Sequence, residues 1–328
     1  MTTRLVHVRT PTYRRPEMLR RALEALQAQS HQDWICDVYD DDREQSGRAV
    51  CDAVADPRIR YRPNLDQKFA SANIDQCFSA DNPHDAEFFF VLEDDNLVLP
   101  ELMRSNIEAC DADGVEILLR NQWIEKLSGT EGAHWSDYGV LDGVLRDQVY
   151  DAETFRLVLL TDIGVSNGGL FWSRRARSVI EIGRPCNATA QEYMRTFGVM
   201  EPIRVAMEPL AVWAENGAQT TRDLGDKASY LKRELNLKRS VQRLQRLAWT
   251  WAGPERRAAY KITSGFLRDP EARKDGLAKA LLAAPDIRSV RRLKLALRGL
   301  AILILGRPGP DFEAFVADCV RRRAETRA

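Results

Sequence analysis

The first two thirds of the chain alternate between short apolar segments and longer amphipathic ones. Apolar and polar side chains alternate from Val6 to Arg9, which is typical of a β-strand over residues 4–9. Residues 16–29 place Leu, Met and Ala at helical spacing behind Pro16, a residue suited to a first helical turn. The same periodicities predict a helix at 70–78 and strands at 34–39, 58–62, 88–92 and 115–119, and an apolar pattern at 203–213 closes this part of the chain. Strands that alternate with helices indicate an α/β fold with a mostly parallel, doubly wound sheet.

The character of the sequence changes near residue 220. From about residue 222 onward the chain is rich in Arg and Leu at helical spacing, and prolines such as Pro254 and Pro270 interrupt it. We therefore expect two domains: an α/β domain over residues 1–218 and an added, basic α-helical domain over residues 219–328.

Charge separates the same two regions. The formal net charge is zero, but residues 1–220 carry 23 Lys and Arg against 36 Asp and Glu, whereas residues 221–328 carry 25 against 12. The acidic first region argues against a nucleic-acid partner. The basic helices either pack on the first domain and form a homodimer contact, or meet an anionic partner such as a lipid-linked diphosphate, a membrane surface or an acidic carrier protein. Residues 287–305 are the best candidate for a membrane-surface helix.

Composition is that of an ordinary globular protein. The 328 residues are 44% hydrophobic and 29% charged, which provides a full core and is too apolar for a disordered chain. No stretch approaches the ~20 apolar residues of a membrane-spanning helix, and the N-terminus runs directly into a strand pattern. The six cysteines lack the paired spacing of a zinc site. We expect a protein with reduced thiols, in the cytoplasm or peripheral to the inner face of the membrane.

Acidic clusters follow two of the predicted strands. Residues 40–42 are Asp-Asp-Asp and residues 93–95 are Glu-Asp-Asp. The ligand crevice of an open α/β sheet lies outside the carboxyl ends of its strands, so both clusters should lie at one edge. The three adjacent carboxylates at 93–95 repel one another, and a divalent cation such as Mg²⁺ or Mn²⁺ would relieve that repulsion. A carboxylate at 40–42 would instead accept hydrogen bonds from a nucleobase. Solvated turns are the alternative for both clusters.

Several segments together, in order and spacing, resemble the family 2 glycosyltransferases of the GT-A fold. The resemblance extends over about residues 4–215, and the matching segments are 8–16, 34–41, 92–100, 168–174, 191–193 and 208–213. It implies an inverting hexosyl- or hexosaminyltransferase that uses a nucleotide-sugar donor. The resemblance favours a UDP-sugar, with dTDP-sugars as the alternative. The acceptor would be a glycan, a lipid-linked intermediate or a small natural product.

The resemblance also assigns residues to the donor site. Pro11 and Tyr13 fall at the start of the nucleotide pocket, with Tyr13 placed to stack on the base. Asp41 falls on the carboxylate that contacts the base. Asp94 falls in the ribose or metal shell, and Asp95 falls on the ligand of the metal that bridges the diphosphate.

Two further carboxylates complete the implied site, and three positions depart from the family pattern. Glu192 falls where the family has its catalytic base. Glu93 stands where many members have Asp, so we expect it in the metal shell with a longer reach. Asp42 replaces a small residue. Ala72 replaces a common Arg, which would leave the phosphate or base contacts to Lys68 or Gln67.

Two other function classes remain open at this point. A nucleotidyltransferase also combines an α/β sheet with metal-binding carboxylates, but it would show a glycine-rich loop after the first strand, and residues 10–15 contain no glycine. A non-catalytic sugar-nucleotide-binding protein is the second alternative. The presence of Asp41, Asp95 and Glu192 weighs against it.

Overall fold

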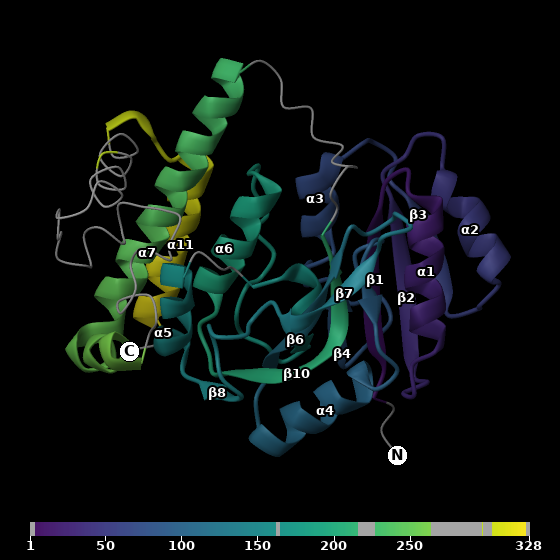
Figure 1. Cartoon of the computed structure of the whole chain (residues 1–328), viewed down its shortest axis with the longest axis horizontal. Helices are drawn as coiled ribbons and strands as arrows, with labels where there is room; N and C mark the ends of the chain where they lie inside the picture. The colour runs from purple at the N-terminus through teal and green to yellow at the C-terminus, as the bar shows by residue number, and fades with distance from the viewer. Residues whose placement is uncertain (1–3, 162–164, 216–226, 264–296, 298–303, 326–328) are drawn as a thin grey trace. The chain divides into compact units, whose positions relative to one another are not determined.

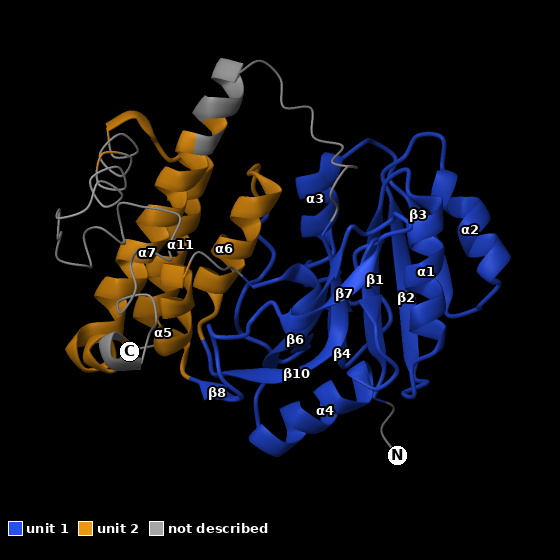
Figure 2. Ribbon diagram, in the orientation of Figure 1, with its two compact units in different colours: residues 1–150, 165–183, 201–220 blue, residues 151–164, 184–200, 221–328 orange. Residues whose placement is uncertain are grey.

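The computed structural model describes residues 4–161, 165–215, 227–263, 297 and 304–325 (Figure 1). Contacts divide the chain into two compact units, which Figure 2 colours separately. Unit 1 comprises residues 1–150, 165–183 and 201–220, and unit 2 comprises residues 151–164, 184–200 and 221–328. The chain therefore leaves unit 1 and re-enters it twice before it continues into the C-terminal helices.

Unit 1 is built on one mixed sheet with the strand order β3-β2-β1-β4-β9-β6-β10-β5, in which β7 also pairs with β6 and β8 with β10. β1 pairs in parallel with β2 and β4, β2 with β3, and β6 with β10, whereas β9 lies antiparallel between β4 and β6. The strands are β1 (Val6–Thr12), β2 (Trp34–Asp40), β3 (Ile59–Pro63), β4 (Phe88–Val91), β5 (Leu97–Val98), β6 (Ile117–Lys126), β7 (His134–Gly139), β8 (Gln148–Tyr150), β9 (Leu170–Ser173) and β10 (Ile203–Ala214).

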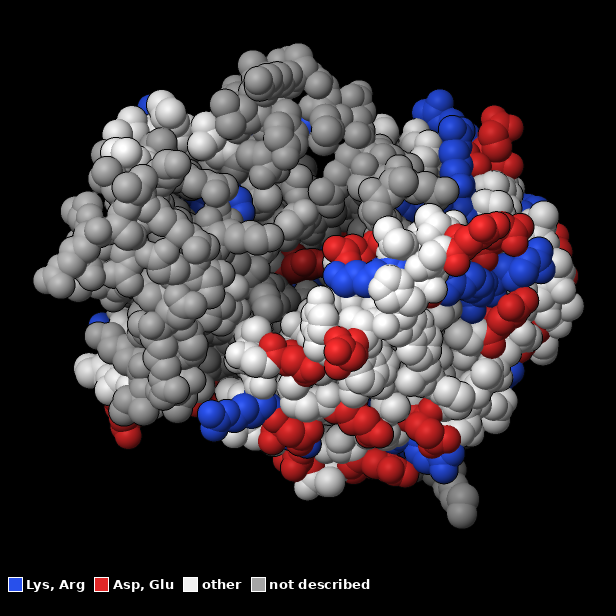
Figure 3. Space-filling model, viewed as in Figure 1, with Lys and Arg blue, Asp and Glu red and all other residues white. Residues whose placement is uncertain are grey.

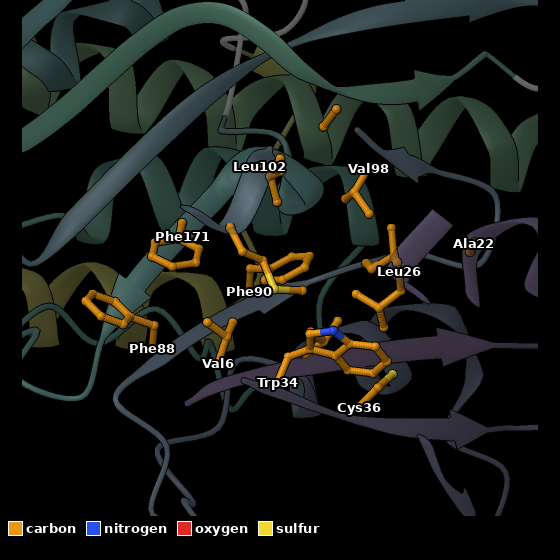
Figure 4. Close-up of a cluster of buried hydrophobic side chains, with 14 of the residues drawn as sticks. Val6, Ala22, Leu26, Trp34, Cys36, Phe88, Phe90, Val98, Leu102 and Phe171 are labelled. Atoms are coloured by element: carbon orange, nitrogen blue, oxygen red, sulfur yellow. The ribbon is translucent and has the colours of Figure 1, made fainter. Parts of the chain in front are cut away.

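Three helices bury their apolar side chains against one face of this sheet. They are α1 (Pro16–Gln27), α2 (Ser46–Val54) and α4 (Leu102–Asp113). Leu26 of α1 and Leu102 of α4 share a core with Val6, Trp34 and Phe90 of the strands (Figure 4). Because side chains alternate along a strand, this packing sends the neighbours of Val6 and Val8 to the opposite face. The remaining helical segments of unit 1 are α3 (Phe69–Gln76) and the short 3-10 turn η2 (Asn167–Gly169).

Unit 2 is helical over its described residues. Its elements are α5 (Ala152–Phe155), the 3-10 helix η1 (Arg156–Thr161), α6 (Ala188–Gly198), α7 (Lys227–Thr263) and α11 (Pro310–Glu325). α7 is interrupted at Gly253, whose φ of 74° is not helical, and Pro254 follows it. Leu157 and Leu160 of η1 pack against Ala252 just before this kink.

Arg156 joins two elements of unit 2. Its side chain is 2% exposed, and it donates hydrogen bonds to the carbonyl oxygens of Phe197 (2.9 Å) and Val199. These carbonyls end α6, where a helix carries partial negative charge. The guanidinium also lies 5.2 Å from the ring centre of Trp251 on α7. Burial lowers the pKa of Arg156 to about 10.

The predicted fold class is confirmed. Unit 1 is an α/β structure whose central strands are mostly parallel, and helices dominate the C-terminal region. The division into domains at residue 218 stays a prediction; the compact units differ from it in that residues 151–164 and 184–200 group with the helices. The pattern did not predict α2 or α4.

Within the described ranges, no helix combines the length and the apolar content that crossing a bilayer requires. The predicted membrane-surface segment, residues 287–305, lies almost entirely outside the described residues.

Candidate functional site

Thr12 brings the two acidic segments together at the carboxyl ends of the strands. It is the last residue of β1, between β2 and β4. Its carbonyl oxygen accepts a hydrogen bond from the backbone N of Asp41 (3.0 Å). Its hydroxyl donates to Oδ2 of Asp94 (2.8 Å). The segments that follow β2 and β4 therefore meet at one residue, as expected for parallel strands that end at the same edge.

Asp94 and Asp95 both contact the guanidinium of Arg15. Nη1 of Arg15 lies 2.6 Å from Oδ2 of Asp95 and 3.4 Å from Oδ1 of Asp94. Asp94 is only 5% exposed. Burial and the neighbouring charge of Asp95 raise the pKa of Asp94, and Arg15 opposes this rise. Burial and mutual repulsion therefore disfavour a full negative charge on both carboxylates.

This pair of carboxylates fits a divalent cation. Mg²⁺ and Mn²⁺ prefer hard oxygen ligands and bind through one or two carboxylates together with substrate phosphates. Asp94 and Asp95 supply such oxygens at adjacent positions, and the raised pKa of Asp94 indicates that more positive charge is favourable there. A cation that binds here competes with Arg15 for the same oxygen atoms.

Glu93 contacts a different set of groups. Its carboxylate accepts hydrogen bonds from the side-chain amides of Asn96 (3.0 Å) and Asn167 (3.1 Å). Oδ1 of Asn96 in turn accepts from the backbone N of Ala214, at the end of β10 (3.0 Å). Glu93 thus ties the acidic segment to η2 and β10. Its role as a metal ligand stays a prediction.

Close packing against a strand explains why residue 169 of η2 is a glycine. A Cβ atom on Gly169 would lie 2.7 Å from the carbonyl oxygen of Arg120 in β6. A residue with a side chain would push η2 away from this strand, and the amide of Asn167 with it.

Asp41 fixes the start of α3. Its Oδ1 accepts hydrogen bonds from the side-chain amide of Asn64 (2.8 Å) and the backbone N of Lys68 (2.7 Å), and Oδ2 accepts from the backbone N of Phe69 (2.7 Å). The carboxylate therefore has three donors from the chain itself. Contact between Asp41 and a base stays a prediction, and it would have to use the remaining acceptor capacity of these oxygens.

The carboxylates on either side of Asp41 also hold loops in place. Asp40 accepts from the backbone N of Gly47 at the start of α2 (2.9 Å) and from the hydroxyl of Tyr61 (2.8 Å). Asp42 pairs with Arg14 (2.9 Å). The carboxylates of residues 40–42 therefore form hydrogen bonds and an ion pair within the protein and do not make up a solvated turn.

The other predicted nucleotide contacts lie around this edge. Pro11 is buried in β1, beside Tyr39 of β2. Tyr13 is half-buried, with its backbone N 3.4 Å from Oδ2 of Asp94. Lys68 is exposed, and its ammonium group donates to the side chain of Gln76. Their contacts with a nucleotide stay predictions.

Glu192 lies in the other unit. It is half-buried on α6, whose first turn is capped by the side chain of Asn187, which accepts from the backbone N of Thr189 (2.8 Å). The carbonyl of Glu192 accepts from the hydroxyl of Thr196 (2.7 Å). Asp41, Asp94 and Asp95 belong to unit 1. The role of Glu192 as a catalytic base stays a prediction.

Three residues at this edge had no role in the sequence prediction. Thr12 and Arg15 lie in the matching segment 8–16. The sequence features that could have identified them are a hydroxyl residue at the end of a predicted strand and a cationic residue three positions later. The third residue, Phe69, is 68% exposed and has a φ of 61°. A large side chain in the left-handed region is uncommon, and it marks the loop beside Asp41 as unusual.

A second polar cluster lies on the opposite face of the sheet from α1. Oδ2 of Asp37 accepts from Nε2 of His7 (3.1 Å) and Nε2 of His84 (2.9 Å). Nε of Arg9 lies 3.4 Å from Nδ1 of His7, and because a guanidinium only donates, this contact leaves the His7 proton on Nε2. A metal ligand needs that nitrogen unprotonated and its other ring nitrogen donating. The cluster is therefore arranged for hydrogen bonding rather than for holding a metal.

Comparisons with known proteins agree with this architecture. The family model described as "Glycosyl transferase family 2" matches residues 8–158. No curated protein matches the sequence. Among solved structures, S. aureus TarS 1-349 in complex with UDP-GlcNAc has a TM-score of 0.53 at 12% identity, covering 81% of this chain and 77% of that chain. The structure of S. aureus TarS has a TM-score of 0.51 at 13% identity, covering 98% of this chain and 55% of that chain.

At such low identity the likeness to TarS concerns the fold, whereas the family model concerns the sequence of the segment that holds Thr12, Arg15, Asp41 and Asp94. The two findings agree with the sheet order and with the GT-A fold that the resemblance implied. Over residues 8–158, a little under half of the chain, the sequence is thus similar to glycosyltransferase family 2.

Proposed function

We propose that this protein transfers a hexosyl or hexosaminyl group from a UDP-sugar to a hydroxyl acceptor, with inversion at the anomeric carbon and with Mn²⁺ or Mg²⁺ bound. The observation that carries the proposal is the meeting of Asp41 and Asp94 at Thr12, at the carboxyl edge of the sheet, with Asp95 next to Asp94. Two neighbours by fold, S. aureus TarS 1-349 with UDP-GlcNAc and with UDP, support a uridine nucleotide as the donor. dTDP-sugars are the alternative donor.

Each group of residues has a separate task in this proposal. Pro11, Tyr13 and Asp41 hold the nucleoside. Asp94 and Asp95 hold the cation, which when bound neutralises charge on the departing diphosphate. Arg15, released from these carboxylates, can pair with a phosphate oxygen instead, since a guanidinium matches phosphate as well as carboxylate.

Glu192 is proposed as the base. It takes the proton from the acceptor hydroxyl while the acceptor oxygen bonds to the anomeric carbon and the bond from that carbon to the diphosphate oxygen breaks. A positioned general base typically contributes about 10²- to 10⁴-fold to such a step. The acceptor is a glycan, a lipid-linked intermediate or a small natural product, and the reaction takes place in the cytoplasm or at the inner face of the membrane.

A donor screen tests this function. We expect UDP-sugars with Mn²⁺ to raise the melting temperature more than dTDP-, GDP- or CMP-sugars do, because a ligand that binds the native state stabilises it. With the best donor, UDP release should depend on Mn²⁺ or Mg²⁺. Release of pyrophosphate from UTP in the presence of a sugar 1-phosphate would favour a nucleotidyltransferase. Donor binding without release of UDP in the presence of any acceptor would favour a non-catalytic binding protein.

A further inference from the structure

A stripe of arginines lies on α7 of unit 2. Arg239, Arg243 and Arg246 are spaced by four and three residues, which places them on one side of a helix. The other side of α7 packs within the unit: Gln245 donates to the carbonyl of Leu159 in η1 (2.8 Å), and Ala252 contacts the same helix. We call Arg239, Arg243 and Arg246 the α7 arginine stripe.

Within the part of the chain that the structure describes, few carboxylates face the α7 arginine stripe. Among the described residues, Glu313 of α11 is the one carboxylate that pairs with any of the three, at 3.5 Å from Nε of Arg243. Nη1 of Arg239 and Nε of Arg246 are shielded from solvent and have no hydrogen-bond partner within those residues. The amide oxygen of Gln242, which lies between them in sequence, is also unpaired there; rotation of this amide would present its NH₂ group instead.

The positive charges of the stripe are buried in part and repel one another. The pKa of Arg246 is lowered, first by burial and then by the charges of Arg239 and Arg243. Shielded polar groups in proteins normally have partners, and an exception calls for an explanation such as a bound ion. Other arginines of unit 2 follow the rule: Arg156 bonds to two carbonyl oxygens, and Arg323 pairs with Glu153 at 2.7 Å.

We propose that the α7 arginine stripe is an anion site that binds a phosphate or diphosphate group of the acceptor molecule. Guanidinium groups match phosphate with paired hydrogen bonds, and three of them suit a group that carries more than one negative charge. A bound phosphate would supply acceptors to the unpaired nitrogens and remove the repulsion among the cations. The link to the acceptor rests on the proposed function, whereas phosphate binding itself does not.

Calorimetric titration of the full chain with pyrophosphate in EDTA tests the site, because EDTA removes cation-dependent binding at Asp94 and Asp95. We expect saturable binding by the wild type that is weakened roughly tenfold or more in Arg239→Gln/Arg246→Gln. Arg256→Gln/Arg321→Gln, which removes the same charge from arginines already paired with carboxylates, should bind like the wild type.

Equal pyrophosphate binding by Arg239→Gln/Arg246→Gln and the wild type, or no saturable binding by the wild type, would overturn the proposal. The proposal would also be overturned if the wild type bound no pyrophosphate but sedimented with phosphatidylglycerol vesicles, and the Arg239→Gln/Arg246→Gln variant did not. That result would assign the stripe to a membrane surface. The melting temperature of each variant shows whether it is folded. Because UDP binding with Mn²⁺ is measured separately, the stripe can fail while the proposed function stands.

Discussion

At the scale of single residues, the site depends on how two carboxylates and one guanidinium share charge. Asp94 and Asp95 are adjacent and poorly exposed, and the guanidinium of Arg15 contacts both. Burial and the charge of Asp95 raise the pKa of Asp94. Arg15 and a divalent cation are therefore competitors for the same oxygens.

Arg15→Gln should strengthen the binding of Mn²⁺ in the absence of nucleotide. The variant removes the competing charge and leaves the carboxylates in place, and we expect an affinity for Mn²⁺ higher by roughly tenfold, the scale on which one neighbouring charge shifts such equilibria. Titration followed by electron paramagnetic resonance measures free Mn²⁺. Arg14→Gln is the matched control, since Arg14 pairs with Asp42 instead. Equal affinities in Arg15→Gln and the wild type would mean that Arg15 does not compete.

Glu192→Gln should separate binding from turnover. Glutamine keeps the size and most hydrogen bonds of the side chain but cannot accept a proton, so we expect UDP-sugar binding to persist and turnover to fall by about 10²-fold or more. Initial rates of UDP release, together with donor affinity by calorimetry, provide the two readouts. Unimpaired turnover would remove Glu192 from its proposed role.

At the scale of elements, the alternation of side chains along β1 places apolar residues on one face of the sheet and polar residues on the other. Val6 and Val8 pack under α1, whereas His7 and Arg9 face a buried polar cluster with Asp37 and His84. Burial lowers the pKa of His7, and the hydrogen bond to Asp37 opposes this only in part. Hydrogen bonds from both histidines hold the pKa of Asp37 well below its usual range, although burial acts in the opposite direction.

Stability should therefore decrease as the pH falls below about 6.5, the pKa of histidine in an unfolded chain. The folded pKa of His7 lies below that value, so the unfolded chain binds more protons and the contribution of His7 is lost as the pH falls toward the folded pKa. Urea unfolding at pH 7.5 and pH 5.5 measures the effect. His7→Gln, which cannot gain a proton, should lose less stability over this interval than the wild type; an equal or larger loss would contradict the assignment.

In unit 2, a buried arginine, Arg156, contributes to stability through its hydrogen bonds. Arg156→Met should lower the free energy of unfolding by about 2–4 kcal/mol, because the carbonyl oxygens of Phe197 and Val199 would lose their buried donor. Arg256→Met is the control: Arg256 is much more exposed and pairs with Asp151, and the expected loss is at most about 1 kcal/mol. Similar losses in both variants, measured by urea unfolding, would show that Arg156 has no special role.

At the scale of the whole molecule, the sequence predicted the α/β fold and the edge at which the acidic segments meet. Periodicity located β1, α1, β2 and β4, because each has a strong apolar pattern and turn residues at its ends. It could not reveal that Asp41 holds the start of α3 or that Arg15 contacts Asp95, because these contacts join loops far apart in the sequence.

A regional charge count does not show how charged side chains are arranged on the surface. Acidic residues outnumber basic ones over residues 1–220, yet acidic and basic side chains are interspersed over the described residues of unit 1 in the view of Figure 3. The ion pairs of unit 1, such as Arg4 with Asp111 and Arg175 with Glu116, account for part of this mixing. The α7 arginine stripe is a local feature that a regional charge count does not locate.

Binding of UDP, measured by calorimetry with Mn²⁺ and with EDTA, tests the central claim most directly. The account predicts that the wild type binds UDP at least about tenfold more tightly with Mn²⁺ than with EDTA, and that Asp95→Ala, with its fold verified by circular dichroism, loses this difference. Binding of UDP that is the same with Mn²⁺ and with EDTA, in the wild type and in Asp95→Ala alike, would contradict a donor site built on Asp94 and Asp95.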